Sequence, residues 1–199
     1  MRSVSVTGQG EARVPPDCAV VRVSAVHRAP GVAEALAGAD SSAEAIAATA
    51  RGFTTPERVA TTSLQLWSDR DEDGRPSGFQ ARHSLVVRCP DIDAAGGLLT
   101  ALADAVGGRL EIEGVSLEVA DQSAALVAAR EAAYADAVDR ATHLAGLAGA
   151  ELGEVQAVAE GGGVGSPGVR MAKAMSASAS FQPGETAVLS SVTVTFQLR

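Results

Sequence analysis

The chain is poor in aromatic residues, cysteine and basic charge. Aromatic residues make up 3% of its 199 residues, so stacking surfaces for bases or sugars have little to be built from. The two cysteines, Cys18 and Cys89, are too few for a disulfide framework and lack the paired spacing of a zinc site. A net charge of -8, from 16 basic and 24 acidic residues, repels a phosphate backbone. Nucleic acid is therefore not an expected partner.

Long hydrophobic runs are also missing. No apolar stretch approaches the roughly 20 residues that cross a bilayer. The opening residues, MRSVSVTGQGEARV, lack the apolar core of roughly 7 to 15 residues that a secretion signal carries. We therefore expect no transmembrane segment and a cytoplasmic location.

The remaining composition is that of a globular protein. Apolar residues make up 46% and charged residues 20%, so neither disorder nor a fibrous repeat fits. The length predicts a single domain over residues 1–199, or two small lobes within it. The exception is the segment 161–185, whose glycine, serine and alanine offer little to bury. It is predicted to form a flexible loop or arm, or one shared with a partner.

Hydrophobic periodicity predicts an α+β fold in which helices pack on antiparallel sheets. The predicted strands are 3–14, 18–28, 59–68, 78–89, 110–119, 154–160 and 188–198, and the predicted helices are 31–53, 92–106 and 121–149. The order is ββαββαβαββ, which excludes a doubly wound parallel sheet. The first two strands are expected to form one hairpin, and the next two a second.

The apolar positions of the helices predict which faces are buried. The segment 31–53 is either one bent helix or two, because Gly38, Asp40 and Ser41 weaken helix propagation. The second helix is predicted to bury Leu99 among its apolar residues, the full set being Ile92, Ala95, Leu99, Leu102 and Val106. The third is alanine-rich, which permits close packing, and its predicted stripe is Leu126, Ala133, Ala137, Leu144 and Leu147.

One local pattern resembles a metal site. Asp69, Asp71, Asp73 and Gly74 match the D-x-D-x-D-G start of a calcium loop, in which alternate carboxylates converge on the cation. The twelfth position is Gln80 instead of the bidentate Glu, and the flanks are predicted strands instead of helices. A solvated hairpin tip with a turn at its glycine is the favoured interpretation.

The remaining candidates have structural interpretations. Gly8 and Gly10, within a strand, indicate a bulge or a close backbone approach and not a dinucleotide fingerprint. His27, His83 and His143 are predicted on two strands and a helix, so a shared site would need tertiary convergence. His83 is expected to be hydrogen-bonded at the edge of a core, and His143 to lie on a solvated face with Asp139. Cys18 and Cys89 are expected to be buried and unreactive.

The order of these segments resembles the SIMPL-domain family, and the resemblance spans nearly the whole chain. It rests on VTGQGEARVPPDCAVV at 6–21, TTSLQL at 61–66, SGFQARHSLVVR at 77–88, AREAAYADAVDRATHLAGLAGAELGEV at 129–155 and PGETAVLSSVTVTFQL at 183–198. The resemblance implies an α+β fold, no established catalytic residues, self-assembly, and bacterial links to the cell envelope and oxidative stress. Because the family has no agreed catalytic motif, no functional residue is carried over to this chain.

Two functions are compatible with these observations. The leading hypothesis is a non-enzymatic protein that self-associates into a homo-oligomer as a structural or interaction module, through its terminal strands or the 161–185 arm. The alternative is a monomeric binding module for a small ligand or a protein partner. An enzyme is not expected, because the sequence places no nucleophile, base and orienting group together. No catalytic, cofactor-binding or metal-binding residue is predicted, and no cofactor.

Overall fold

The α+β prediction is confirmed by a computed structural model, which describes residues 2–70, 74, 76–161 and 184–199. The elements follow the predicted order ββαββαβαββ. Their bounds are β1 Ser3–Val14, β2 Cys18–Ala29, α1 Val32–Ala50, β3 Val59–Arg70, β4 Pro76–Cys89, α2 Ile92–Val106, β5 Leu110–Glu118, α3 Ser123–Leu147, β6 Leu152–Glu160 and β7 Thr186–Leu198. The predicted arm, 161–185, lies almost entirely outside the described residues. The chain divides into two compact units.

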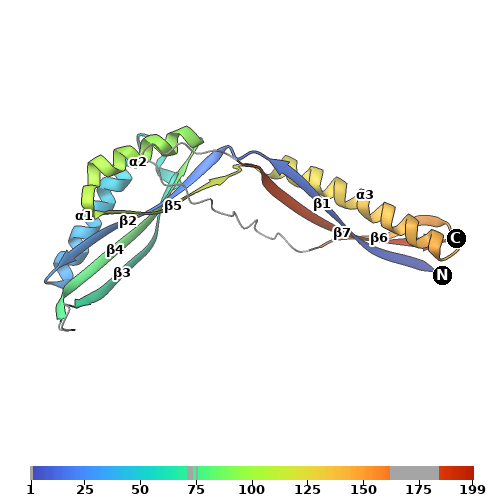
Figure 1. Ribbon diagram of the computed structural model, residues 1–199, viewed down its shortest axis with the longest axis horizontal. Helices are drawn as coiled ribbons and strands as arrows, with labels where there is room; N and C mark the ends of the chain where they lie inside the picture. Colours follow the sequence, from blue (N-terminus) through green and yellow to red (C-terminus); the bar gives the residue numbers. More distant parts are fainter. Residues whose placement is uncertain (1, 71–73, 75, 162–183) are drawn as a thin grey trace. The chain divides into compact units, whose positions relative to one another are not determined.

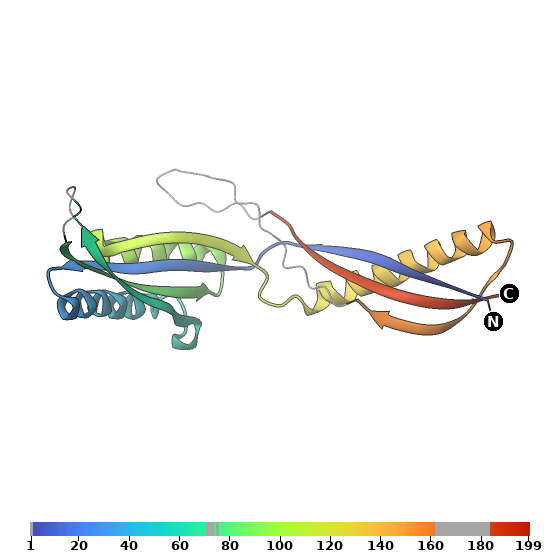
Figure 2. The same ribbon diagram turned by 90° about the horizontal axis from the view of Figure 1, so that it is seen from below.

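One unit contains a four-stranded antiparallel sheet in the order β3-β4-β2-β5. The second predicted hairpin, β3 with β4, is confirmed. Helices α1 and α2 lie together on one face of this sheet, as Figures 1 and 2 show. The core between them is built from alternate residues of β2 and β4 and one stripe of each helix: Ala19, Val21, Val23, Leu85, Val87, Ile46, Ala50, Leu98 and Leu102. On the opposite face of the sheet, no helix is formed by the residues that the structure describes (Figure 1).

Helix α1 is one continuous helix, which settles the alternative left open by its sequence. Gly38, a residue expected to weaken it, is where the ring of His27 packs from β2, and a Cβ at this position would overlap that ring. Asp40 is also occupied, since its carboxylate is hydrogen-bonded to His83. The residues that weaken the helix locally are therefore compensated by contacts with the sheet.

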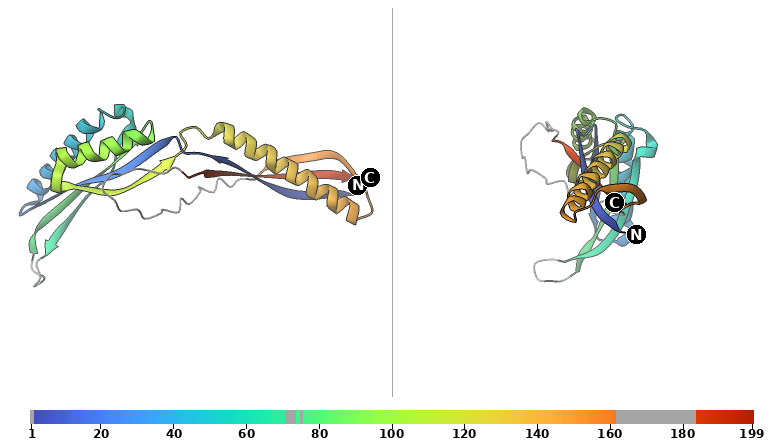
Figure 3. Two further views of the ribbon diagram at one scale, coloured as in Figure 1. Left: turned by 45° about the horizontal axis from the view of Figure 1, so that its top comes forward. Right: turned by 90° about the vertical axis from the view of Figure 1, so that its right-hand side faces the viewer.

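The other unit is a three-stranded antiparallel sheet in the order β1-β7-β6, covered on one face by α3 (Figure 3). The first predicted hairpin is therefore wrong. β1 pairs with β7 from Ser3↔Gln197 to Val14↔Thr186, whereas β2 pairs with β4 and β5 in the other sheet. The alternation of β1 was interpreted correctly, with Val6 buried beside Gly8 and Gly10 and the intervening residues exposed. The strand that pairs with β1 was predicted wrongly, because the short Pro-Pro-Asp connection after β1 suggested a local turn to β2.

Helix α3 lies against the sheet through a stripe that consists only of alanine. The buried residues recur at every fourth position: Ala125, Ala129, Ala133, Ala137, Ala141 and Ala145. The predicted stripe is thus wrong at its leucines, because Leu144 is 44% exposed and Leu147 73% exposed. Gly8 and Gly10 face this stripe, and a Cβ on either glycine would overlap a backbone oxygen of the helix, Ala133 or Ala129 respectively. The close approach favoured for these glycines is confirmed.

The helix ends follow ordinary capping chemistry. Asp91 accepts a hydrogen bond from the Ala94 amide at 2.7 Å and so caps α2, which ends at Gly107 with a φ of 61°. Asp121 accepts from the Ser123 amide at 2.9 Å at the start of α3, and this bond lowers the pKa of its carboxyl. Among the described residues, no helix is long and apolar enough to cross a membrane.

Candidate functional site

A hollow of about 350 Å³ opens between α1 and the β3–β4 hairpin. Its lining combines three aliphatic and four polar side chains, and three of the polar ones, from three different elements, are hydrogen-bonded in series. The lining residues are Asp40, Ala43, Glu44, Ala47, Thr61, His83 and Leu85. Helical spacing places Asp40 and Glu44 on one face of α1, one turn apart. Thr61 lies on β3 and His83 on the neighbouring strand, β4.

His83 is hydrogen-bonded at both ring nitrogens. Its Nδ1 lies 2.9 Å from Oδ1 of Asp40, and its Nε2 lies 3.0 Å from Oγ1 of Thr61. A carboxylate only accepts, so Nδ1 donates to Asp40. In a neutral imidazole, Nε2 is then an acceptor and the Thr61 hydroxyl donates to it. A hydroxyl, an imidazole and a carboxylate therefore stand in one hydrogen-bonded series.

The middle group of this series, the imidazole of His83, is less exposed to solvent than the groups on either side of it. The imidazole is mostly covered, with 18% of its side chain exposed, while the Asp40 side chain is 52% exposed and Thr61 is an exposed residue. The prediction of a hydrogen-bonded histidine at the edge of a core is confirmed. The sequence reasoning missed the two partners, because helix α1 and strand β3 bring them to His83 from distant positions in the chain.

The other two histidines do not join this group. His27 packs on Gly38, and His143 is exposed on α3, in the three-stranded unit. Among the described residues no three His, Cys, Asp or Glu side chains are grouped so that they could hold a metal ion. His83 therefore belongs to a hydroxyl–carboxylate network and not to a histidine cluster.

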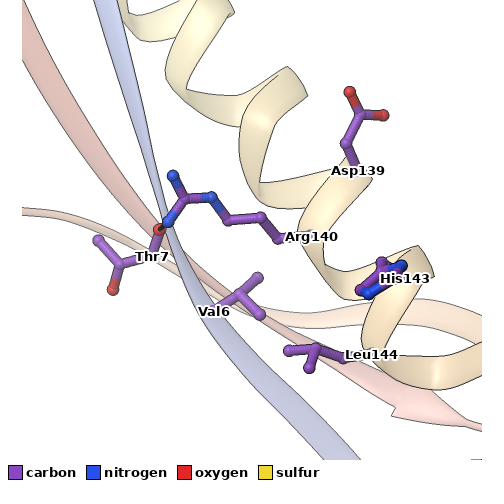
Figure 4. Close-up of a pocket in the computed structure, with 6 residues that line it drawn as sticks. All are labelled: Val6, Thr7, Asp139, Arg140, His143 and Leu144. Atoms are coloured by element: carbon purple, nitrogen blue, oxygen red, sulfur yellow. Dashed lines mark hydrogen bonds between the residues drawn. The ribbon is translucent and has the colours of Figure 1, made fainter. Parts of the chain in front are cut away.

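A second hollow, of about 480 Å³, lies between α3 and β1 (Figure 4). Val6, Thr7 and Leu144 line it together with three polar residues of α3, Asp139, Arg140 and His143. The polar side chain that reaches across it is already occupied, because Arg140 Nη1 donates to the Thr7 carbonyl at 3.2 Å. Arg140 also pairs with Asp136, whose pKa is lowered first by the hydrogen bond from the Gln9 amide at 2.8 Å. This hollow therefore lies along the contact between α3 and β1, and the hydrogen bonds of Arg140 and Asp136 hold the helix and the strand together there.

The helix-free face of the four-stranded sheet carries a satisfied polar network. The Ser24 hydroxyl donates to Glu113 on β5 and accepts a hydrogen bond from the Ser84 hydroxyl, 2.7 Å away across β2 and β4. The guanidinium of Arg82 pairs with Glu113 and lies 6.0 Å from the centre of the Trp67 ring. Ser24 is fully buried, so its hydroxyl is not available to a ligand.

Strand β3 is an edge strand with an apolar surface. Within the described residues it pairs only with β4, so one row of its backbone groups has no strand partner. It has no charged residue from Val59 to Ser68, and Leu64, Leu66 and Trp67 are 50%, 38% and 39% exposed. The other edge strands, β1, β5 and β6, each carry glutamates. Charged residues on an edge oppose pairing with another chain, and β3 lacks them over most of its length.

The candidate calcium loop is only partly described. Asp71 and Asp73 lie outside the described residues. Asp69 is the second-to-last residue of β3, and its carboxylate forms an ion pair with the Nε of Arg28 at 3.3 Å. Its backbone partner on β4 is Gly78, so this first position belongs to the hairpin ladder.

Both cysteines are free and partly or fully covered. Cys89 is buried beneath α2, and Cys18 is half-buried with its thiol donating to the Glu118 carbonyl at 3.2 Å. Burial is the main cause that raises the pKa of each thiol, and neighbouring carboxylates add to it. The expectation of buried thiols holds for Cys89 and in part for Cys18.

The raised pKa of both thiols predicts slow alkylation at neutral pH. The thiolate is the reactive form, and a raised pKa delays its appearance until the pH exceeds that of an ordinary thiol. We expect iodoacetamide to modify the native protein more slowly than free glutathione at pH 7, and the rate to rise only at a pH above that at which an ordinary thiol ionises. Mass spectrometry of the time course measures this, with the urea-unfolded chain as control. Modification at the glutathione rate would show that the thiols are accessible and unshifted.

Comparison with known proteins gives one result. The family model SIMPL, described as a protein of unknown function (DUF541), matches residues 4–196. The match runs from β1 to β7 and so includes both compact units. A search of curated proteins finds no match.

Proposed function

The chain belongs to the SIMPL family of proteins of unknown function, and from this premise we propose that it acts by self-association, as a structural or interaction module. The observation that carries the proposal is the edge of strand β3. Its 12 residues form a long edge with exposed leucines and without charge from Val59 to Ser68. An edge of this kind pairs with a strand of another copy, and the role needs no catalytic group.

We place the pairing surface on β3, whereas the sequence suggested the terminal strands or the 161–185 arm, which lies almost entirely outside the described residues. β7 is the central strand of its sheet and is paired on both sides, so it offers no free edge. β1 pairs on one side and carries Glu11 and Arg13. β3 is the edge strand whose composition favours pairing with a second copy. Two copies related by a two-fold axis would pair their β3 strands antiparallel, each contributing the same surface.

Lysine at Leu64 and Leu66 is expected to weaken this self-association. The two side chains lie on one face of β3, and like charges on facing strands oppose pairing. Each cross-strand pair is worth roughly 0.2–1 kcal/mol, so we expect the dissociation constant of Leu64→Lys/Leu66→Lys to rise about tenfold or more. Size-exclusion chromatography with light scattering over a wide concentration range measures it, against a monomer of 20.0 kDa.

The control is Ile112→Lys. Ile112 is 51% exposed on β5, the other edge of the same sheet, and lies between two glutamates. This variant should assemble like the unmodified protein. A 20.0 kDa monomer at every concentration would contradict self-association and favour the alternative, a monomeric module that binds a ligand or a protein partner, for example in the hollow beside His83.

We extend the proposal to the oxidative stress response that the family resemblance implies. We propose that the protein acts in such a response by self-association and not by oxidation of its thiols. The support is the environment of Cys18 and Cys89, whose raised pKa disfavours the thiolate that oxidants attack. The alkylation experiment above tests this point.

A further inference from the structure

We propose that Thr61 is a nucleophile that is acylated by small activated esters, with His83 as its general base and Asp40 as the residue that positions the imidazole. This activity goes beyond the proposed assembly role. The observation behind it is the series of two hydrogen bonds, 2.9 Å from Asp40 to Nδ1 and 3.0 Å from Nε2 to the Thr61 hydroxyl. A nucleophile bonded to a base, and a base bonded to an orienting carboxylate, is the arrangement by which hydroxyl groups are activated for acyl transfer.

The position of the hydroxyl supports a reactive role. Thr61 is exposed, so an ester can reach its Oγ1 from solvent, whereas most of the imidazole is covered and held in one orientation. The hollow beside it is lined in part by the aliphatic side chains of Ala43, Ala47 and Leu85. A short aliphatic acyl group fits such a lining, and about 350 Å³ is enough for it.

The neighbouring threonine shows what an ordinary hydroxyl does on this strand. Thr62 donates to the Ser84 carbonyl at 3.2 Å, which is a backbone acceptor with no proton-transfer capacity. Thr61 donates to an imidazole nitrogen instead. Two adjacent hydroxyls of the same chemical type thus differ in having or lacking a base, and they form a matched pair for an experiment.

The reaction balances with the residues present. Thr61 Oγ1 forms a bond to the ester carbonyl carbon while its proton moves to Nε2 of His83. The bond from that carbon to the leaving oxygen then breaks, and the leaving group takes the proton from His83. In the second step water attacks the acyl-threonine, His83 accepts the water's proton, and the acid is released as Thr61 regains its hydrogen. The sum is ester plus water giving acid plus alcohol.

The surroundings also limit the substrate. Among the residues that line the hollow in the described chain there is no Lys or Arg to stabilise an oxyanion, and Asp40 and Glu44 are acidic. The inference is therefore confined to activated esters, whose leaving groups need little assistance, and does not extend to amides.

The test is acetylation of the full chain by p-nitrophenyl acetate. Intact mass spectrometry should show a gain of one acetyl group, and fragmentation of the tryptic peptide 59–70, released at Arg58 and Arg70, should place it on Thr61. Thr61→Val should abolish this adduct and Thr61→Ser should retain it, because serine keeps the hydroxyl and relieves the crowding of the methyl group. His83→Gln should slow acetylation about 100-fold, and Asp40→Asn about tenfold or more.

Two controls separate activation from ordinary surface chemistry. Thr62→Val and His143→Gln should leave the rate of acetylation unchanged, since neither residue belongs to the series. Circular dichroism and thermal melting identify variants that fail to fold, and the Thr61→Ser and Thr61→Val pair keeps the test valid if His83→Gln unfolds. An adduct on another residue, an adduct that persists in Thr61→Val, or no adduct above that of the urea-unfolded chain would overturn the inference. None of these results bears on the light-scattering test of assembly.

Discussion

Replacing Gly8 with alanine is expected to break the packing of α3 on the three-stranded sheet. The new Cβ would overlap the carbonyl oxygen of Ala133 and lie 2.5 Å from the amide nitrogen of Ala137. Both are backbone atoms, so no change of rotamer relieves the clash, and helix and sheet must separate along the alanine stripe. The cost should reach or exceed the upper end of the roughly 1–3 kcal/mol typical of overpacked cores.

Hydrogen exchange followed by mass spectrometry measures this effect where it occurs. In Gly8→Ala, peptides from α3, β1 and β7 should lose protection, while those from β2 and β4 should keep it. The matched control is Gly114→Ala on β5, because a Cβ there meets nothing within 4 Å. Equal protection of α3 in the two variants would show that the helix does not rest on the backbone of β1.

Truncation of Leu98 to alanine should produce the other large loss of stability. Leu98 is fully buried in the core of the four-stranded unit, between α2 and the sheet. Removal of a buried leucine side chain forfeits its transfer free energy and leaves a cavity, at a cost of about 2–5 kcal/mol. Urea denaturation, followed by circular dichroism and by the fluorescence of Trp67 in the same unit, measures the change.

Its neighbour provides the control and a test of the helix register. The sequence predicted Leu99 as the buried residue of α2, whereas the structure buries Leu98 fully and Leu99 only in part. Leu99→Ala should therefore cost clearly less than Leu98→Ala. The reverse order would mean that α2 is rotated by one residue about its axis, as the sequence pattern suggested.

Much of the fold was predictable because the spacing of apolar residues along the chain indicates where strands and helices form. Alternation in β1 and β7 and the steps of three and four in α1 identified the elements and their order. The partner of β1 was not predictable in this way. Alternation states which face is buried but not against which strand, and the true partner, β7, is at the far end of the chain.

The stripe of α3 was missed for a related physical reason. Leucines were expected to be buried because they have more apolar surface than alanine. The distance between the backbones of β1 and α3 decides instead which side chains are buried. Because β1 has glycines at the contact, α3 comes so close that only alanine fits between them. Gly8 and Gly10 in a strand, together with alanine at every fourth position of a helix, are the signal that could have shown this.

The candidate site could not be assembled from sequence alone. His83 was placed correctly at a core edge, but Asp40 was considered only as a residue that weakens a helix, and Thr61 only as part of a strand. Neither residue has a spacing relative to His83 that a motif could encode. The three meet because α1 crosses the β3–β4 hairpin at this position.

The pairing of the two chain ends in one sheet has a consequence for how the protein is made. The strands β2 to β5 follow one another between Cys18 and Glu118, so their unit can fold while the ribosome is still at work. β1 is synthesised before these strands, yet its partner is β7, which follows them. Until β7 has been synthesised, β1 has no strand of its own sheet to pair with, and the loop that closes between them contains all the elements from β2 to β6. This sheet can therefore form only after the strands of the other unit have been synthesised.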